Sequence, residues 1–300
     1  MSYQTSFEME PYGEAPSPYV PRACDNRSLP VIGTVAAVTP NRVTCAKQPA
    51  VFGVNNPGPV VTTAVARAVE MVDNTIRELV NARQHVCAGE PPAWPLLGDI
   101  TADWLKNRLG ICIDDIHTWT AGTFVNRSVA EVIRRLVRVR NLIASNAIRY
   151  ICSDAGCSPG DWAFVFIDPT CKDTPPTVIR LCRAFWVKRA DVTANDQAEF
   201  QAQTILHEAS HLFHCTQDKR GASIGVAECL AQFVAATNGS PIDPHFAARC
   251  THAQRCAGPP PAAGLGFAAP TTSSLIRLTT KFEPQKAIRL KGRPAVRHRR

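Results

Sequence analysis

The sequence lacks any apolar run of about 18 residues or more, so none of its segments is predicted to span a membrane. Residues 1–30 contain no basic stretch followed by an apolar one, which argues against a secretory signal peptide. No internal repeat is found along the chain. With 45% hydrophobic and 19% charged residues, the composition excludes a chain that is disordered throughout.

Excess positive charge is missing from most of the chain, although the net charge is +8. From Arg277 to the end there are nine Lys or Arg and one acid, Glu283, so the rest holds 24 basic and 24 acidic residues. The body is therefore neutral, and any contact with a polyanion is expected to involve residues 277–300. The oligomeric state does not follow from the sequence.

Cysteine, in contrast, is abundant. The twelve cysteines include several close neighbours, such as Cys152 and Cys157, which favours disulfides over free buried thiols, although spacing does not give the connectivity. Disulfides form in oxidising compartments. Since no signal peptide is expected, secretion by a non-classical route is the localisation that we predict.

Three segments differ in composition. Residues 1–58 are rich in Pro and Gly and predict an irregular lead-in with a short strand around Val31–Val38. Residues 59–256 carry the periodic patterns of a folded domain. Residues 257–300 begin as a Pro, Ala and Gly linker and end as a basic tail, which we expect to be flexible.

Apolar residues at three- and four-residue spacing predict a helix from Val60 through Leu79, and a shorter one from Asp99 to Leu109 that Gly110 ends. Ser128 and Glu131 have the form of a capping box before another apolar stripe. The other face of this third helix is basic and is interpreted as solvated; its residues are Arg134, Arg135, Arg138 and Arg140.

Three short segments rich in β-branched and aromatic residues, 148–152, 163–167 and 177–182, predict the strands of a small sheet. The strand near Ile179–Leu181 is expected at its edge, where an extended peptide could pair with it. Asp196, with Glu199 three residues later, then predicts the start of a helix that runs to about Cys215.

That helix contains "TILHEASHLFHC", residues 204–215. His207 and His211 are four residues apart, so both project from one helical face and both can bind one Zn²⁺. Glu208 can reach the open position of such a metal and accept a proton from its water, as in H-E-x-x-H peptidases. A buried helix with incidental histidines is the alternative interpretation.

A catalytic zinc needs a third protein ligand. Glu228 is the only carboxylate of the apolar segment 222–236, which is expected to form a helix from Ser223 to Thr237 and to end at Asn238 and Gly239. Glu228 is therefore the predicted third ligand. A partly exposed, non-ligating Glu228 is the alternative, and the other candidate ligands are Asp218, His214 and Cys215.

Five segments in order, "IRYIC", "AFVFI", "VIRLCRAFW", "TILHEASHLFH" and "VAECLAQFV", resemble the deuterolysin-like zinc peptidases, in particular the lysine-specific metallo-endopeptidases. The resemblance covers residues 60–238 and implies that His207 and His211 bind zinc and that Glu208 is catalytic. In that family the third ligand is an aspartate in a G-T-x-D-x-x-Y-G loop, which also supplies a tyrosine. This loop is absent here, and all four tyrosines, Tyr3, Tyr12, Tyr19 and Tyr150, precede the zinc motif.

Together these features predict an α+β fold with a helical N-terminal lobe, a small sheet, the zinc helix and a following helix. The predicted function is that of a zinc endopeptidase with Glu208 as general base and a protein or peptide as substrate. Two alternatives remain, a zinc-binding module without activity and an interaction protein that acts through its basic tail. No acidic residue matches the lysine pocket of the family, so its cleavage preference is not carried over.

Overall fold

The computed structural model describes residues 24, 42–44, 56–88, 96–123, 127–158, 160–166, 177–187, 193–214, 226–242, 247 and 250. All of them lie in one compact unit, Met1–Gly258. The expected strand at Val31–Val38, the candidate ligand Asp218, and the linker and tail fall outside the described residues. None of the helices in the described part is both long and apolar enough to cross a bilayer.

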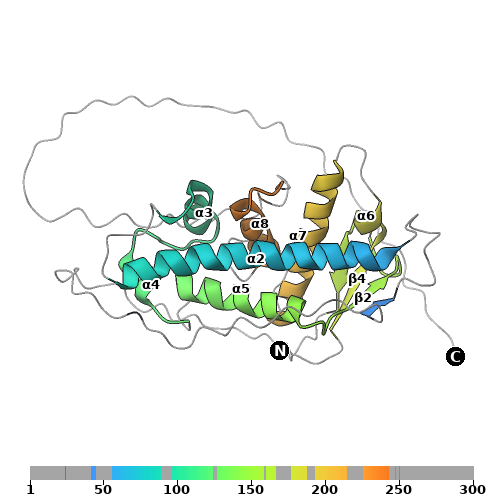
Figure 1. Cartoon of the computed structure of the whole chain (residues 1–300), viewed down its shortest axis with the longest axis horizontal. Helices are drawn as coiled ribbons and strands as arrows, with labels where there is room; N and C mark the ends of the chain where they lie inside the picture. The colour runs from blue at the N-terminus through green and yellow to red at the C-terminus, as the bar shows by residue number, and fades with distance from the viewer. Residues whose placement is uncertain are drawn as a thin grey trace, which may run out of the picture. The chain divides into compact units, whose positions relative to one another are not determined.

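The longest element is helix α2, Pro57–Cys87, which begins with Pro at its first turn, where a missing N–H costs no helical hydrogen bond. Its predicted apolar stripe is buried: Val65, Val69, Val72, Ile76 and Leu79 are all at most 4% exposed. That face packs against α5, Val129–Ala144, and α7, Ala194–His214 (Figure 1). The periodicity therefore identified the central helix correctly.

Helix α5 begins as the sequence predicted. The Ser128 hydroxyl accepts a hydrogen bond from the Glu131 backbone N–H at 3.1 Å. The Glu131 carboxylate in turn accepts hydrogen bonds from Arg134 and Arg135, so these two guanidinium groups are paired. Although burial alone would raise it, these two arginines lower the pKa of Glu131 below its ordinary value.

The prediction that all four arginines of α5 are solvated is wrong for Arg140. Its side chain is only 5% exposed, and Nε lies 2.9 Å from Oδ1 of Asp73 on α2. Nη2 donates to Oδ2 of Asp73 at 3.1 Å, so the pair is bidentate. A carboxylate on a neighbouring helix, which the pattern within α5 does not reveal, explains the burial. Arg138 is exposed, as predicted.

Between α2 and α5 the chain forms three short helical pieces. They are α3, Asp99–Asp103, the π-helix η3, Trp104–Arg108, and α4, Ile116–Thr120. Gly110 follows with a φ of 68°, so the predicted glycine stop is confirmed. The π geometry was not predicted, and neither was α4, which the Asp115 carboxylate caps at the His117 N–H, 2.9 Å away.

The four-stranded sheet contains β1, Val43–Thr44, β2, Arg149–Cys152, β3, Ala163–Val165, and β4, Val178–Leu181. Its order is β1-β2-β4-β3. The first three strands in this order are parallel, and β3 runs antiparallel to β4. Strands were expected at β2, β3 and β4. The prediction that the strand near Ile179–Leu181 is at the edge is wrong, because β4 lies inside the sheet. The edge strand beside α7 is β3, which packs against this helix.

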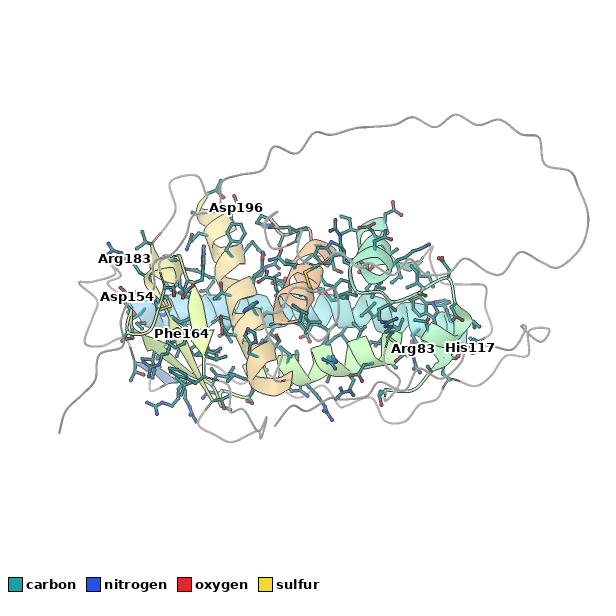
Figure 2. The ribbon with its side chains drawn as sticks, turned by 180° about the vertical axis from the view of Figure 1, so that it is seen from behind. Arg83, His117, Asp154, Phe164, Arg183 and Asp196 are labelled. Atoms are coloured by element: carbon teal, nitrogen blue, oxygen red, sulfur yellow. A yellow bond between two sulfur atoms is a disulfide. The ribbon has the colours of Figure 1, made fainter. Side chains whose placement is uncertain are left out.

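After the sheet, α6, Arg183–Trp186, leads into α7. The Arg183 N–H donates to Oδ1 of Asp154 at 2.9 Å, which fixes the start of α6 to the loop after β2 (Figure 2). The cap of α7 is Thr193, whose hydroxyl accepts from the Asp196 N–H at 3.1 Å. The capping pair is therefore Thr193 and Asp196, three residues earlier in the sequence than the predicted pair of Asp196 and Glu199.

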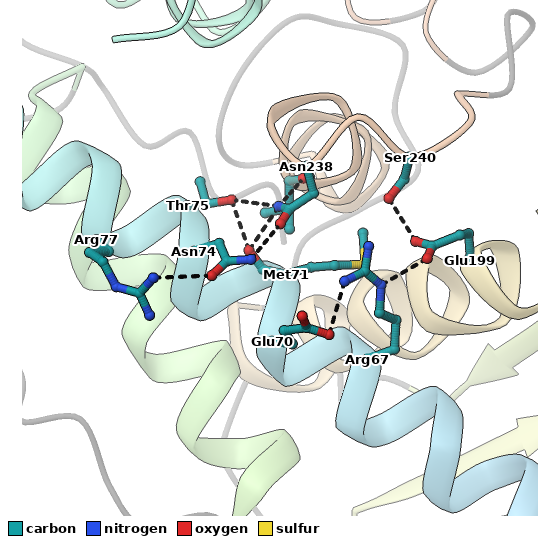
Figure 3. Close-up of polar contacts among 10 residues, drawn as sticks. Arg67, Glu70, Met71, Asn74, Thr75, Arg77, Glu199, Asn238 and Ser240 are labelled. Carbon is teal, nitrogen blue, oxygen red and sulfur yellow. Dashed lines mark hydrogen bonds and ion pairs between the residues drawn. The ribbon is translucent and has the colours of Figure 1, made fainter. Parts of the chain in front are cut away.

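Helix α8, Ala227–Thr237, begins later than Ser223 because Val226 is extended. It ends as predicted, with Asn238 as its C-cap and Gly239 at a φ of 65°. The Asn238 amide donates to the carbonyls of Val234 at 2.8 Å and of Met71, on α2, at 2.9 Å. The residue that ends α8 therefore also fixes α8 to α2 (Figure 3).

A second polar cluster fixes α7 to the same helix. Oε1 of Glu199 on α7 accepts from Nε of Arg67 at 2.8 Å, and Oε2 accepts from the Ser240 hydroxyl at 2.6 Å (Figure 3). Glu199, predicted as a capping residue, instead joins α2, α7 and the segment after α8. Hydrogen bonds to a charged group of this kind stabilise a fold by about 1.5–3 kcal/mol.

The prediction of disulfides is confirmed. Three pairs have both partners among the described residues, Cys24–Cys87, Cys157–Cys182 and Cys229–Cys250, and no described cysteine is free. The partners are 63, 25 and 21 residues apart, so the bonds link separate elements instead of close neighbours in the sequence. Cys229 lies in the first turn of α8 and ties this helix to Cys250.

Candidate metal centre

The zinc motif lies in the last third of α7, on a helix that is fixed along its length. Ile205, Leu206 and Ala209 are fully buried and hold this part of α7 in the core. Residues 207 and 211 are one turn apart, so their side chains leave the helix in the same direction. The apolar positions thus determine which way the two histidines face.

The structure brings His207 and His211 together. Their Nε2 atoms are 3.0 Å apart, and the ring centroids are separated by 4.6 Å at an interplanar angle of 84°. Two nitrogens bound to one tetrahedral zinc, each at about 2.0–2.1 Å, are about 3.3–3.4 Å apart. The two Nε2 atoms therefore need little movement to bind the same ion.

Glu208 is the next residue on α7 and is 5% exposed. Its Oε1 lies 4.0 Å from Nε2 of His207. This carboxylate is thus close to the nitrogens without lying between them. A group in this position can hold a water molecule at the histidine pair and exchange a proton with it.

Glu228 approaches from α8, on the other side of the His207 ring. Its Oε2 lies 3.2 Å from Nδ1 of His207, and its side chain is 13% exposed. Its Oε1 accepts a hydrogen bond from Nε2 of Gln232 at 2.9 Å. The structure therefore brings Glu228 to the histidine pair, but on Nδ1 instead of Nε2.

The degree of burial differs across the site. His211 is 4% exposed, whereas the side chain of His207 is 17% exposed. His207 is therefore the more accessible of the two imidazoles.

Two imidazoles with nearby carboxylates form the kind of donor set that Zn²⁺ binds in enzymes, so these residues fit the metal that the motif implies. Among the residues that the structure describes, no group of three His, Cys, Asp or Glu side chains surrounds one point as a metal ion requires. The assignment of Glu228 as third ligand stays a prediction. Asp218, Cys215 and the side chain of His214 lie outside the described part.

The sequence analysis missed Gln232, which is 4% exposed and contacts Glu228. Its signal was present, since Glu228 and Gln232 are the only polar side chains in "AECLAQFVAA" and stand four residues apart. The structure also gives no role at the site to Tyr150. Its hydroxyl, on β2, is buried and has no hydrogen-bond partner among the described residues, and burial raises the pKa of this phenol above its ordinary value.

Residues 114–237 match the family model described as lysine-specific metallo-endopeptidase. The matched span begins two residues before α4, ends with α8 and includes both histidines, Glu208 and Glu228. The search of curated proteins and that of solved structures gave no match. The match confirms the resemblance inferred from the sequence: residues 114–237 are similar to the lysine-specific metallo-endopeptidases.

Proposed function

We propose that this protein is a zinc-dependent endopeptidase in which His207 and His211 bind the metal and Glu208 is the general base. The observation that supports this most directly is the 3.0 Å separation of the two Nε2 atoms, with the Glu208 carboxylate beside them on the same helix. Bound zinc supplies a Lewis acid that polarises a scissile carbonyl and makes a water molecule more acidic.

Glu208 would carry the proton. In this proposal its carboxylate accepts a proton from the attacking water and delivers it to the nitrogen of the leaving amine. Its burial, at 5% exposure, keeps bulk water away from that carboxylate and strengthens its interaction with charges at the histidine pair. The neighbouring buried residues of α7 hold the side chain at this position.

Strand β3 is the proposed site for the substrate backbone, in place of the strand near Ile179–Leu181, which lies inside the sheet. β3 is an edge strand of the described sheet, and edge strands bind extended peptides through main-chain hydrogen bonds. Trp162, just before β3, contacts Phe200 of α7 edge to face, with ring centroids 5.9 Å apart. This contact fixes the edge strand beside the helix that carries the zinc motif.

The cysteines support the localisation expected from the sequence. Three disulfides in the described residues are typical of a protein that folds in an oxidising compartment, so we propose that the peptidase acts outside the reducing cytosol.

One rival function has a specific observation in its favour. The G-T-x-D-x-x-Y-G loop of the family is missing from the sequence, which favours a zinc-binding module without activity. An interaction protein that acts through its basic tail would need neither metal nor proteolysis.

Measurement of zinc content and casein proteolysis on the full chain, with the variant Glu208→Gln, separates these functions. The wild type should hold about one zinc per chain and cleave casein, and chelation should abolish cleavage. Glu208→Gln should retain zinc and lose activity by about 10²–10⁴-fold. Glu70→Gln, the same change at an exposed side chain of α2, is the control and should keep most of the activity.

Equal activity of wild type and Glu208→Gln would remove Glu208 from the mechanism. A wild type that binds zinc but does not cleave would support the inactive module. A folded wild type without zinc would refute the proposal as a whole.

A further inference from the structure

We propose that Glu228 positions the imidazole of His207 and is not the zinc ligand that the sequence favoured. In this proposal Gln232 holds the Glu228 carboxylate in place. The inference rests on the proposed function, because it concerns how the same zinc site is supported. Four contacts of buried or nearly buried side chains carry it.

The first contact orients Glu228. Gln232 lies one turn further along α8, and its Nε2 donates to Oε1 of Glu228 at 2.9 Å. The same NH₂ group lies 3.4 Å from Oε1 of Gln203 on α7. Gln203 in turn donates from Nε2 to the carbonyl of Pro241 at 2.9 Å. These contacts form a chain of polar groups between α7, α8 and the segment that follows α8.

The direction of the Gln232 amide is determined by its neighbours. Both N–H groups of its amide face acceptors, one on Glu228 and one on Gln203. Oε1 of Gln232 is buried and has no hydrogen-bond partner in the part of the chain that the structure describes. A flipped amide would place that oxygen against two acceptor oxygens, which is less favourable still. Gln232 therefore acts as a donor to the Glu228 carboxylate.

With Oε1 engaged by Gln232, Glu228 directs Oε2 at Nδ1 of His207, 3.2 Å away. The two atoms are at the distance of an ion pair, but among the described residues their alignment does not meet the geometry of a hydrogen bond, so Glu228 acts on Nδ1 through its charge. A carboxylate at Nδ1 favours the tautomer with its proton on Nδ1, which leaves the lone pair on Nε2. Nε2 is the atom that faces His211.

The same geometry argues against ligation by Glu228. The two nitrogens of an imidazole point in widely different directions, so a carboxylate in contact with Nδ1 lies away from an ion held at Nε2. Glu228 would have to leave both Gln232 and Nδ1 to reach that ion. As a positioning residue it keeps both contacts and makes His207 a more basic ligand.

Zinc affinity and the cobalt spectrum together test the proposal. Zinc affinity is measured on the full chain by competition with a chromophoric chelator, and the absorption spectrum of the Co²⁺-loaded protein reports the ligand set. Glu228→Gln should weaken zinc binding by about tenfold to a hundredfold and leave the cobalt bands in place. Gln232→Met should weaken binding in the same direction by a smaller factor.

Because Gln232 acts through Glu228, the double variant should bind zinc no more weakly than Glu228→Gln alone. Glu70→Gln is the matched control, since it makes the same change at a side chain of α2 that is 61% exposed, and should leave zinc affinity and the spectrum unchanged.

Shifted cobalt bands in Glu228→Gln would show that Glu228 is a ligand and overturn the proposal. Unchanged zinc affinity in that variant would show that the contact with Nδ1 has no effect on metal binding. Additive losses of affinity in the double variant would show that Gln232 does not act through Glu228. If Glu228→Gln fails to fold, unchanged zinc affinity in Gln232→Met alone overturns the proposal. A wild type without zinc would refute the proposed function itself, whereas a zinc-binding wild type with an unaffected Glu228→Gln refutes this inference only.

Discussion

The pair of Arg140 and Asp73 gives a quantitative test of how α2 and α5 are held together. Replacing Asp73 with Ala leaves a guanidinium that is 5% exposed without its bidentate partner. Removal of one member of a buried ion pair typically costs about 3–5 kcal/mol, because the remaining charge is uncompensated.

Two features reduce the expected cost. The Asp73 side chain is 28% exposed, so the pair is partly hydrated, and Nη1 of Arg140 keeps a contact with Oδ1 of Asn141 at 3.5 Å. We therefore expect Asp73→Ala to lower the free energy of unfolding by about 2–3 kcal/mol. Adding Arg140→Met to this variant should recover part of the loss, since an apolar chain of similar length replaces the buried guanidinium that has lost its carboxylate.

Urea unfolding followed by circular dichroism measures these free energies, with Arg138→Ala as the control from the exposed part of the same helix. The control should change the free energy of unfolding by no more than about 0.5 kcal/mol. If Asp73→Ala costs as little as the control, Arg140 behaves as a solvated side chain, and the reasoning from its burial is refuted.

Three further outcomes are expected. Glu131→Gln should destabilise the protein at neutral pH. Because the folded-state pKa of Glu131 is lowered, its contribution to the free energy of unfolding is present above the unfolded-state pKa and is lost as the pH falls through the folded-state pKa. The urea unfolding curves of variant and wild type should therefore converge well below pH 4.5. Gly239→Ala should cost about 1 kcal/mol, because a φ of 65° strains Ala although no atom lies within 4 Å of its Cβ, and an unchanged melting temperature would contradict this. Deletion of residues 277–300 should leave zinc content and casein cleavage intact while weakening retention on heparin; loss of zinc would show that the tail supports the domain.

Local patterns predicted the helices well. The stripe of α2, the hydroxyl cap at Ser128 and the stop at Gly239 each depend on residues within a few positions of one another. The cap of α7 was predicted three residues too late, at Asp196. Thr193 also stands three residues before an acid, and it is the residue that caps the helix. Patterns of this kind overlap, and only the backbone geometry separates them.

What the sequence did not predict depends on partners from distant segments. Arg140 is buried because Asp73 lies on a helix 67 residues earlier, and β4 is internal because β1 and β3 take the two edges. The histidine pair and Glu208 followed from spacing on one helix. The side of His207 that Glu228 approaches depends on the packing of α8 on α7, so no spacing rule could give it.

The Cys24–Cys87 disulfide gives the chain a covalent loop of 63 residues whose far end is the last residue of α2. If the proposed endopeptidase activity is confirmed, copies of the protein can cut one another, and the irregular lead-in predicted from the sequence is the kind of segment that proteases cut. A cut anywhere between these two cysteines would leave both fragments joined through the sulfur atoms. Nicked molecules would therefore migrate as intact protein on a non-reducing gel and separate only after reduction, so the N-terminal segment remains attached after the peptide chain itself is broken.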